Sequence, residues 1–160
     1  MSTNKPIESR DTSIDEVTFA RFSGHYLFSD SDFLLARARA VTAARAMPYL
    51  SEFSLNTGTY FLLALACAES SPTINELSQI LLISDAEAEL LVDELERLFL
   101  IARRPDARNK NGVVVTATPQ GEDLFAKARE ALTTMEHDPL QQLSLAERKQ
   151  LADLLGRIAF

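Results

Sequence analysis

Apolar residues recur at helical intervals along most of this chain, and that pattern predicts a mainly α fold. Residues 32–47 are rich in alanine and follow an expected N-cap at Ser31, and Pro48 either ends or kinks this first long helix. Asn56 can cap a second helix that runs to about residue 68, and because its residues 60–65 are apolar on every side this helix must be deeply buried. Four more amphipathic helices are expected to begin near residues 74, 85, 119 and 145.

The middle of the chain contains two capping-box patterns in close succession. Thr73 and Glu76 have the spacing at which a helix-capping hydroxyl and a carboxylate satisfy each other's backbone N–H groups, and Ser84 and Glu87 repeat it. Only a short turn fits between the two helices that begin there. The sequence therefore predicts a helix-turn-helix.

Two short β-prone runs follow the second of these helices, at residues 100–104 and 113–117. The Asn111-Gly112 pair between them favours a type I′ hairpin turn. Thr118 then caps a helix that has Pro119 at its first position. We expect this hairpin to form the wing of a winged helix-turn-helix.

Composition restricts the class of protein. A formal charge of −7 and a pI near 4.8 disfavour a generic nucleic-acid or anionic-membrane binder. Cys67 is the only cysteine, which is ordinary for a reducing cytoplasm, and the longest apolar run, residues 60–68, is too short to span a bilayer. A cytoplasmic protein is expected. Residues 1–30 are expected to form a flexible arm, with room for a short helix within residues 13–26.

Charge is segregated between the helix-turn-helix and the wing. Residues 73–101 hold seven acids and a single base, Arg97, whereas four bases lie close together in the hairpin with only Asp106 opposing them. These four are Arg103, Arg104, Arg108 and Lys110. The second helix carries Asp85, Glu87, Glu89, Asp93, Glu94 and Glu96, a surface that DNA phosphates would repel.

The order of the elements and several motifs resemble the MarR family of bacterial winged-helix regulators. Leu55-Asn56 stands at the family's cap of the second helix, and INELSQILLISDAEAELLVDELERLFLIARRPD runs without a gap against its helix-turn-helix. The strand VVVTATPQG is similar to the family's closing wing strand, with Thr118 and Gly121 in register. The resemblance covers about residues 31–158.

What this resemblance implies is a mainly α protomer with flanking dimerisation helices and one β-hairpin wing. Residues 31–160 would form the protomer, with a winged helix-turn-helix lobe at 55–121 and dimerisation helices at 31–54 and 122–160. The homodimer would present two reading helices to successive major grooves of a pseudo-palindromic duplex site, about 34 Å apart. Family members commonly respond to a small aromatic ligand, for which no binding residue is identifiable. A ligand-responsive repressor is the expected function.

Two departures from the family pattern affect the predicted DNA contacts. The reading helix begins with acidic and apolar residues in place of Arg and hydroxyl residues, and Asn109, Lys110 and Asn111 replace the wing's Asp-Arg-Arg run. Phe99 stands where the family favours Gly. The predicted DNA-binding residues are Ala86, Glu89, Leu90, Arg103, Arg104, Arg108, Asn109 and Lys110. Glu89 would accept from cytosine N4, and Ala86 or Leu90 would meet a thymine methyl.

The residues disfavour several other functions. No nucleophile elbow, phosphate-binding glycine loop or paired catalytic constellation is present, so the chain is not expected to be an enzyme or to need a cofactor. Cys67 is predicted to be a core residue and residues 136–138 a polar loop rather than a metal site. Aromatic residues near the ends of the first two helices favour core packing over a ligand cleft. They are His25, Tyr26, Tyr49, Phe53 and Tyr60. The alternative function is a MarR-fold protein with reduced or lost DNA binding that acts through protein contacts.

Overall fold

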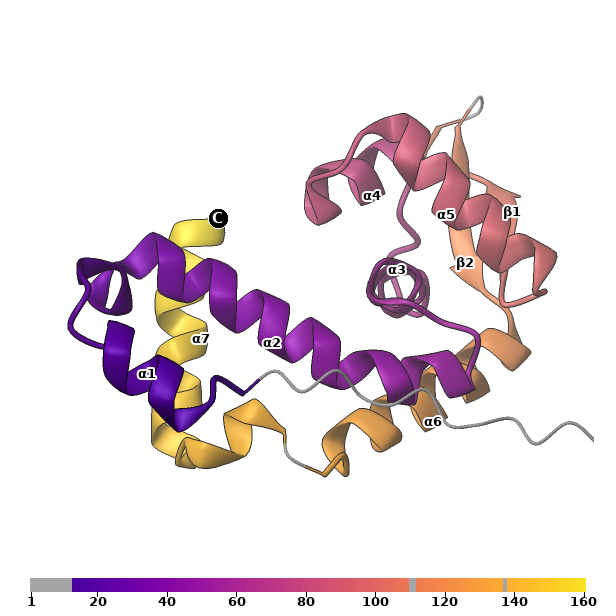
Figure 1. The fold of residues 1–160 in the computed structure, drawn as a ribbon. Helices are drawn as coiled ribbons and strands as arrows, with labels where there is room; N and C mark the ends of the chain where they lie inside the picture. The colour runs from indigo at the N-terminus through magenta and orange to yellow at the C-terminus, as the bar shows by residue number, and fades with distance from the viewer. Residues whose placement is uncertain (1–12, 110–111, 137) are drawn as a thin grey trace, which may run out of the picture. The chain divides into compact units, whose positions relative to one another are not determined.

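A computed structural model describes residues 13–109, 112–136 and 138–160. The elements are α1 (Glu16–Phe22), the 3₁₀ helix η1 (Tyr26–Ser29), α2 (Ser31–Glu52), α3 (Thr57–Ala66), α4 (Ile74–Leu81), α5 (Asp85–Arg97), β1 (Ile101–Pro105), β2 (Val113–Ala117), α6 (Pro119–Thr133), the 3₁₀ helix η2 (Pro139–Gln142) and α7 (Leu145–Ala159) (Figure 1). This mainly helical chain with one antiparallel hairpin confirms the predicted fold class. The chain divides into two compact units. Within the described part of the chain, residues 47–134 form the winged-helix unit, and residues 13–46 with 135–160 form the terminal unit.

Helix α3 lies at the centre of the winged-helix unit, in contact with α4, α5, α6 and β2 (Figure 1). Leu62 and Leu63 of α3 are completely buried, as the uniformly apolar sequence of this helix predicts. They are joined in the core by Leu77 of α4, Ala88, Val92 and Leu95 of α5, and Val115 of β2. This shared core fixes the helix-turn-helix against the hairpin.

The capping chemistry places the helix starts where the sequence predicts them. The Thr73 N–H donates to Glu76 over 2.7 Å, and the Ser84 N–H donates to Glu87 over 2.9 Å. Both capping boxes of the helix-turn-helix are complete, and so is the one formed by Ser144 and Glu147. A fourth box, in which Thr59 is the partner of Asn56, was not anticipated from the sequence.

The first long helix has a different N-cap from the predicted one, and of the two alternatives at Pro48, an end or a kink, the structure excludes the end. It continues through Pro48 to Glu52, so Pro48 does not end it. A proline inside a helix removes one backbone hydrogen bond without removing those on either side, so the helix carries on past it. Its N-cap is Asp30 rather than Ser31, because the Asp30 carboxylate accepts from the Phe33 N–H over 2.9 Å.

The hairpin strands are confirmed to within a residue, but their register excludes the expected tight turn. Pro105 pairs with Val113, and the Asp106 N–H donates to the carbonyl of Gly112 over 2.9 Å. A two-residue turn centred on Asn111-Gly112 would pair residue 110 with Val113 instead. Residues 106–112 therefore form a longer connection, in which Lys110 and Asn111 lie outside the described residues.

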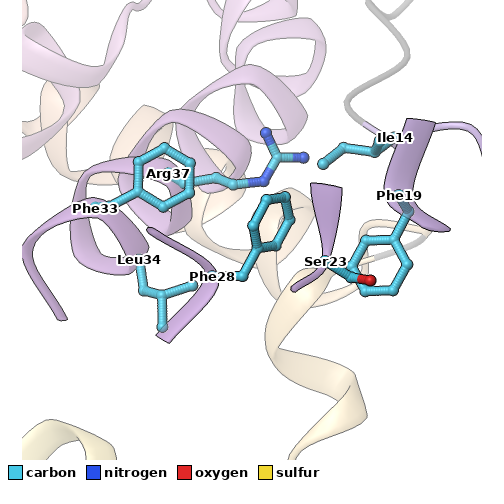
Figure 2. Close-up of a pocket in the computed structure, with 7 residues that line it drawn as sticks. All are labelled: Ile14, Phe19, Ser23, Phe28, Phe33, Leu34 and Arg37. Carbon is cyan, nitrogen blue, oxygen red and sulfur yellow. The ribbon is translucent and has the colours of Figure 1, made fainter. Parts of the chain in front are cut away.

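The terminal unit buries little of its apolar surface within one protomer. The predicted short helix near the N-terminus is present as α1, and neither α1 nor α7 contains a buried residue. Phe19, Phe28 and Phe33 gather near the start of α2 (Figure 2). Residues 1–12, predicted to be a mobile arm, lie outside the described residues. Among the described helices, none has the length and apolar character needed to cross a membrane.

Candidate nucleic-acid interface

The acidic residues of α5 are largely engaged within the winged-helix unit. Glu87 completes the Ser84 capping box, and the hydrogen bonds from Ser84 hold the pKa of Glu87 below its ordinary value of 4.5. The carboxylate of Asp85 accepts a hydrogen bond from the hydroxyl of Ser78, which joins the start of α5 to α4. Capping and inter-helix bonding therefore explain two of the six acids without reference to DNA.

Three further acids of α5 surround one arginine of the wing. Arg103 in β1 makes ion pairs with Glu89 and Asp93, each over 2.7 Å, and with Glu96. Glu89, Asp93 and Glu96 are spaced so that they lie along one side of the helix, next to β1. Arg103 is 29% exposed, and the hydrogen bond to Asp93 is the largest cause of its raised pKa, with Glu89 and Glu96 adding to it. Asp106 is the only acid among the wing bases in the sequence, but in the structure three acids of α5 also oppose Arg103.

The outward face of α5 is less acidic than the sequence of the helix suggests. Helical spacing places Ala86, Leu90, Asp93 and Arg97 on the side opposite the buried Ala88, Val92 and Leu95, and the carboxylate of Asp93 is paired with Arg103. Ala86 is exposed, and Leu90 is 67% exposed. Of the six acids on this helix, Glu94 is the one whose side chain forms no hydrogen bond or ion pair within the described residues.

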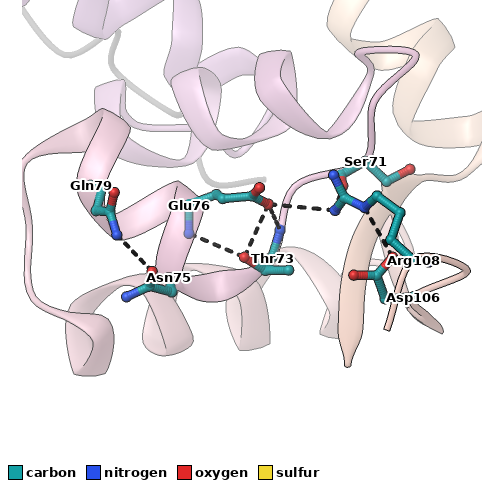
Figure 3. Close-up of polar contacts among 7 residues, drawn as sticks. All are labelled: Ser71, Thr73, Asn75, Glu76, Gln79, Asp106 and Arg108. Carbon is teal, nitrogen blue, oxygen red and sulfur yellow. Dashed lines mark hydrogen bonds and ion pairs between the residues drawn. The ribbon is translucent and has the colours of Figure 1, made fainter. Parts of the chain in front are cut away.

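A second polar cluster joins the connection between the wing strands to α4 (Figure 3). Arg108 donates to Asp106 over 3.1 Å and to the carbonyl of Ser71 over 3.4 Å, and its guanidinium lies 3.7 Å from Glu76. Hydrogen bonds from the Arg108 backbone and side chain hold the pKa of Asp106 low, and bonds from Thr73 do the same for Glu76. Arg108 is exposed, so water reaches the cluster.

Two further predicted DNA contacts in the hairpin, Arg104 and Asn109, lie within the described residues. The side chain of Arg104 is exposed and forms no hydrogen bond or ion pair with the part of the chain that the structure describes. Successive side chains of a strand point to opposite faces, so Arg104 points away from the face on which Arg103 meets α5. Asn109 is exposed, and Lys110 lies outside the described residues.

Two bulky apolar residues flank α5 in a backbone conformation that favours glycine. Leu82 ends α4 with φ 54°, and Phe99 follows α5 with φ 58°. Their side chains are 92% and 74% exposed, so burial in the core does not offset the steric cost of this left-handed conformation. Phe99 was singled out from the sequence as standing at a glycine position, whereas the geometry at Leu82 was not anticipated.

Cys67 and Tyr60 lie in surroundings that favour a packing role. Cys67 is half-buried, and burial raises the pKa of its thiol, which disfavours a reactive thiolate. The Tyr60 ring packs 5.5 Å from that of Phe125, measured between centroids. Within the described residues no cluster of His, Cys, Asp and Glu has the arrangement of a metal site, and His137 lies outside them.

Comparison with known proteins finds no matching family model and no matching curated protein. Solved structures do match. A MarR-family transcriptional regulator from Rhodococcus sp. RHA1 is 24% identical with a TM-score of 0.78, over 86% of this chain and 97% of that one. CouR from Rhodococcus jostii RHA1, bound to p-coumaroyl-CoA, is 24% identical with a TM-score of 0.79, over 86% and 96%.

The transcriptional repressor CouR bound to a 23-mer DNA duplex is 20% identical with a TM-score of 0.76, over 85% of this chain and 96% of that one. These proteins are transcriptional regulators. The match extends over nearly their whole length. The chain therefore has the winged helix-turn-helix fold of the MarR family of transcriptional regulators.

Proposed function

We propose that this chain is a dimeric, ligand-responsive transcriptional regulator, a repressor, that binds a pseudo-palindromic DNA duplex. The observation that carries the proposal is the engagement of the α5 acids within the winged-helix unit. Arg103 offsets part of the charge of Glu89, Asp93 and Glu96, so the reading helix repels phosphates less than its sequence implies. The outward face of α5 is then able to approach a major groove.

In this proposal the two kinds of contact come from different elements. Ala86 and Leu90 on α5 meet the methyl groups of thymines, because both are exposed and apolar. Glu89 is held at the edge of the same helix by Arg103 and accepts from a cytosine amino group with its remaining lone pairs. The helix supplies sequence preference and little affinity.

Affinity comes from phosphate contacts of the wing. Arg104 points to the open face of the hairpin, and Arg108, Asn109 and Lys110 belong to the connection between its strands. Arg103 supports the interface from behind, since it is paired with α5. Each phosphate neutralised releases counterions, so the logarithm of the binding constant should fall with the logarithm of salt concentration by about 0.9 per contact.

The exposed apolar surface of the terminal unit supports the homodimer. Leu154, Leu155 and Ile158 of α7 lie on one side of the helix and remain accessible to water in the single chain. Leu34 and Leu35 of α2 are exposed as well. An exposed apolar surface of this kind is typical of a subunit interface. The ligand response is supported by the CouR structure, which holds p-coumaroyl-CoA.

The decisive experiment is a salt titration with the duplex upstream of the chain's own gene. Fluorescence anisotropy should show sub-micromolar binding at low salt, with affinity falling steeply as salt is raised. The Arg104→Ala protein should lose most of its affinity for the duplex. The slope of the logarithm of the binding constant against the logarithm of salt concentration should also become smaller in magnitude by about 1, because one phosphate contact is removed. Lys127→Ala is the matched control, since Lys127 lies on α6, is paired with Asp123 and carries the same charge. Absence of duplex binding by an intact dimer at low ionic strength would refute the proposal.

A second candidate function is supported by the exposed Leu90 within α5 and the exposed Phe99 that follows the helix. In this alternative the protein retains the fold, has lost DNA binding and uses α5 to contact another protein. The substitution Glu89→Gln distinguishes the two functions experimentally. A change in operator sequence preference places Glu89 at a base edge and eliminates the alternative.

A further inference from the structure

The segment that precedes α4 is attached to the wing by backbone contacts. Thr73 forms an isolated antiparallel β-bridge with Val114, and the Val115 N–H donates to the carbonyl of Pro72 over 2.8 Å. Both contacts fix β2 against this segment. The connection between the wing strands, residues 106–112, lies beyond them along the chain, so its orientation depends on other contacts.

Asp106 shapes the described part of the connection. Its carboxylate accepts from the backbone N–H of Arg108 over 2.8 Å, and its carbonyl accepts from the Asn109 N–H over 3.2 Å. The Gly112 N–H in turn donates to the carbonyl of Asn109 over 2.9 Å. These bonds join residues of the connection to one another, so they set its local shape and not its orientation relative to α4.

The side chain of Arg108 joins the connection to the start of α4 (Figure 3). Its Nε donates to Asp106 over 3.1 Å, whereas Nη2 donates to the carbonyl of Ser71 over 3.4 Å and lies 3.7 Å from Glu76. Nε and Nη2 belong to one rigid plane, so a guanidinium that is held at both atoms fixes the connection relative to the helix start. These contacts are called the Arg108 link below.

The charge of Arg108 is opposed on both sides. Hydrogen bonds hold the pKa of Asp106 and that of Glu76 below their ordinary values, so both carboxylates are ionised at neutral pH. One cation and two anions leave the link with a net negative charge, and a phosphate that approaches Arg108 also meets both carboxylates. The side chain of Arg104 has no such partner within the described residues. The surroundings of Arg108 therefore suit a link between two elements better than a phosphate contact.

Glu76 is oriented independently of Arg108. Its Oε2 accepts from the Thr73 N–H over 2.7 Å and from the Thr73 hydroxyl over 3.0 Å, which completes the capping box of α4. The same oxygen faces Nη2 of Arg108. A side chain that is already held in one rotamer loses little further entropy when it forms an ion pair. The link therefore ends on a fixed point at the helix start.

We infer that Arg108 is a positioning residue, which orients the wing connection for DNA binding by linking Asp106 to the start of α4 and does not itself bind a phosphate. The inference rests on the proposed function and refines it, because it leaves the phosphate contacts to the other wing residues. The link is partly exposed to water, so its contribution should correspond to a factor of about two to five in an equilibrium constant.

Hydrogen exchange in the free protein, followed by NMR, tests the link without DNA. Arg108→Gln should speed exchange at the N–H groups of Asp106 and Gly112 about two- to fivefold, because both are bonded within the connection. Arg108→Lys should do the same, since one ammonium nitrogen cannot occupy the positions of both Nε and Nη2. The Ala88 N–H in α5, bonded to the carbonyl of Ser84, is the internal reference and should not change. Circular dichroism melting checks that each variant is folded, and unchanged exchange in the folded Arg108→Gln protein overturns the inference.

Fluorescence anisotropy with the upstream duplex distinguishes orientation from charge. Arg108→Lys keeps the positive charge, so a phosphate contact at this position would survive the substitution. Loss of the link should instead weaken binding about two- to fivefold, as in Arg108→Gln. An Arg108→Lys protein with faster exchange at Asp106 and wild-type affinity would place Arg108 on a phosphate and overturn the inference.

Glu76→Gln gives the two explanations opposite signs. Glutamine is accepted at this position of a capping box, so α4 keeps its start while one negative charge is removed. Electrostatics alone would then strengthen DNA binding, whereas loss of the link should weaken it about two- to fivefold. Combining Glu76→Gln with Arg108→Gln should weaken binding no more than Arg108→Gln alone, because both substitutions break one link.

Glu94→Gln is the matched control, since it removes the same charge from a side chain that forms no hydrogen bond or ion pair within the described residues, and it should not weaken binding. Tighter binding by the folded Glu76→Gln protein overturns the inference. Absence of duplex binding by the wild type refutes the proposed function, whereas unchanged exchange in Arg108→Gln refutes the link. The two failures are therefore distinguishable.

Discussion

The guanidinium of Arg103 in β1 lies 2.7 Å from the carboxylate of Asp93 in α5, and this ion pair fastens the wing to the reading helix. Glu89 and Glu96 join the same arginine. One cation shared by three anions leaves the cluster with net negative charge. The pairing therefore reduces the repulsion between α5 and DNA and does not abolish it. The orientation of the hairpin relative to α5 depends on this cluster as well as on the apolar core.

Arg103→Gln should lower the free energy of unfolding by about 1 kcal/mol, because the ion pairs are partly exposed to solvent and exposed pairs contribute little. Urea denaturation measures the loss, which should shrink as salt screens the pairs. Arg104→Gln removes the same charge from the neighbouring position and should change stability by less than about 0.5 kcal/mol. Equal effects of the two substitutions would contradict a specific role for Arg103.

Gly121→Ala should destabilise the winged-helix unit by about 3 kcal/mol, in the range of an overpacked core position. A Cβ atom at Gly121 would lie 1.9 Å from the carbonyl oxygen of Leu100, which also accepts from the Thr118 N–H. Backbone atoms on both sides must then move. Thermal unfolding measures the change, and Gly156→Ala is the control because no atom lies within 4 Å of its added Cβ. A Gly121→Ala protein as stable as the control would show that the junction relaxes freely.

The elements that the sequence predicted best are those set by local chemistry. The boxes at Thr73 and Ser84 place the helix starts because their partners are three residues away. The strands follow from two β-prone runs in the same way. Both features are readable from a few neighbouring residues, so tertiary packing has little opportunity to override them.

The features that the sequence did not predict depend on residues far apart in the chain. Glu89 and Arg103 are fourteen positions apart, and no local pattern indicates that they meet. The cluster of Phe19, Phe28 and Phe33 forms because the chain folds back between Phe19 and Phe33. The prediction of a tight turn was wrong. Asn111-Gly112 favours such a turn locally, but the pairing of Pro105 with Val113 requires a longer connection. In each case tertiary structure decides between locally acceptable alternatives.

Leu82→Gly should raise the free energy of unfolding by about 1 kcal/mol, since glycine adopts positive φ without a Cβ clash. The leucine side chain is 92% exposed and contributes little packing. Leu90→Gly is the matched control, because it removes an exposed leucine from the interior of α5 and should cost about 1 kcal/mol. Urea denaturation of the two variants should give shifts of opposite sign. A loss of stability in Leu82→Gly would indicate that the exposed side chain has a packing partner in the dimer.

The stability conferred by Glu87 should depend on pH in a defined direction. Hydrogen bonds from Ser84 hold the pKa of Glu87 in the folded state below 4.5, its ordinary value, so the folded state binds fewer protons than the unfolded state. The contribution is therefore fully present above pH 4.5 and is lost as pH falls through the lowered pKa. Glutamine keeps an acceptor oxygen and does not titrate. The stability difference between the wild type and Glu87→Gln should be widest near neutral pH and should close below pH 4.5. Glu94→Gln, which removes the same charge from the same helix, controls for net charge in the urea titrations. A difference that stays constant from neutral to acid pH would show that the ionised carboxylate is not what completes the cap.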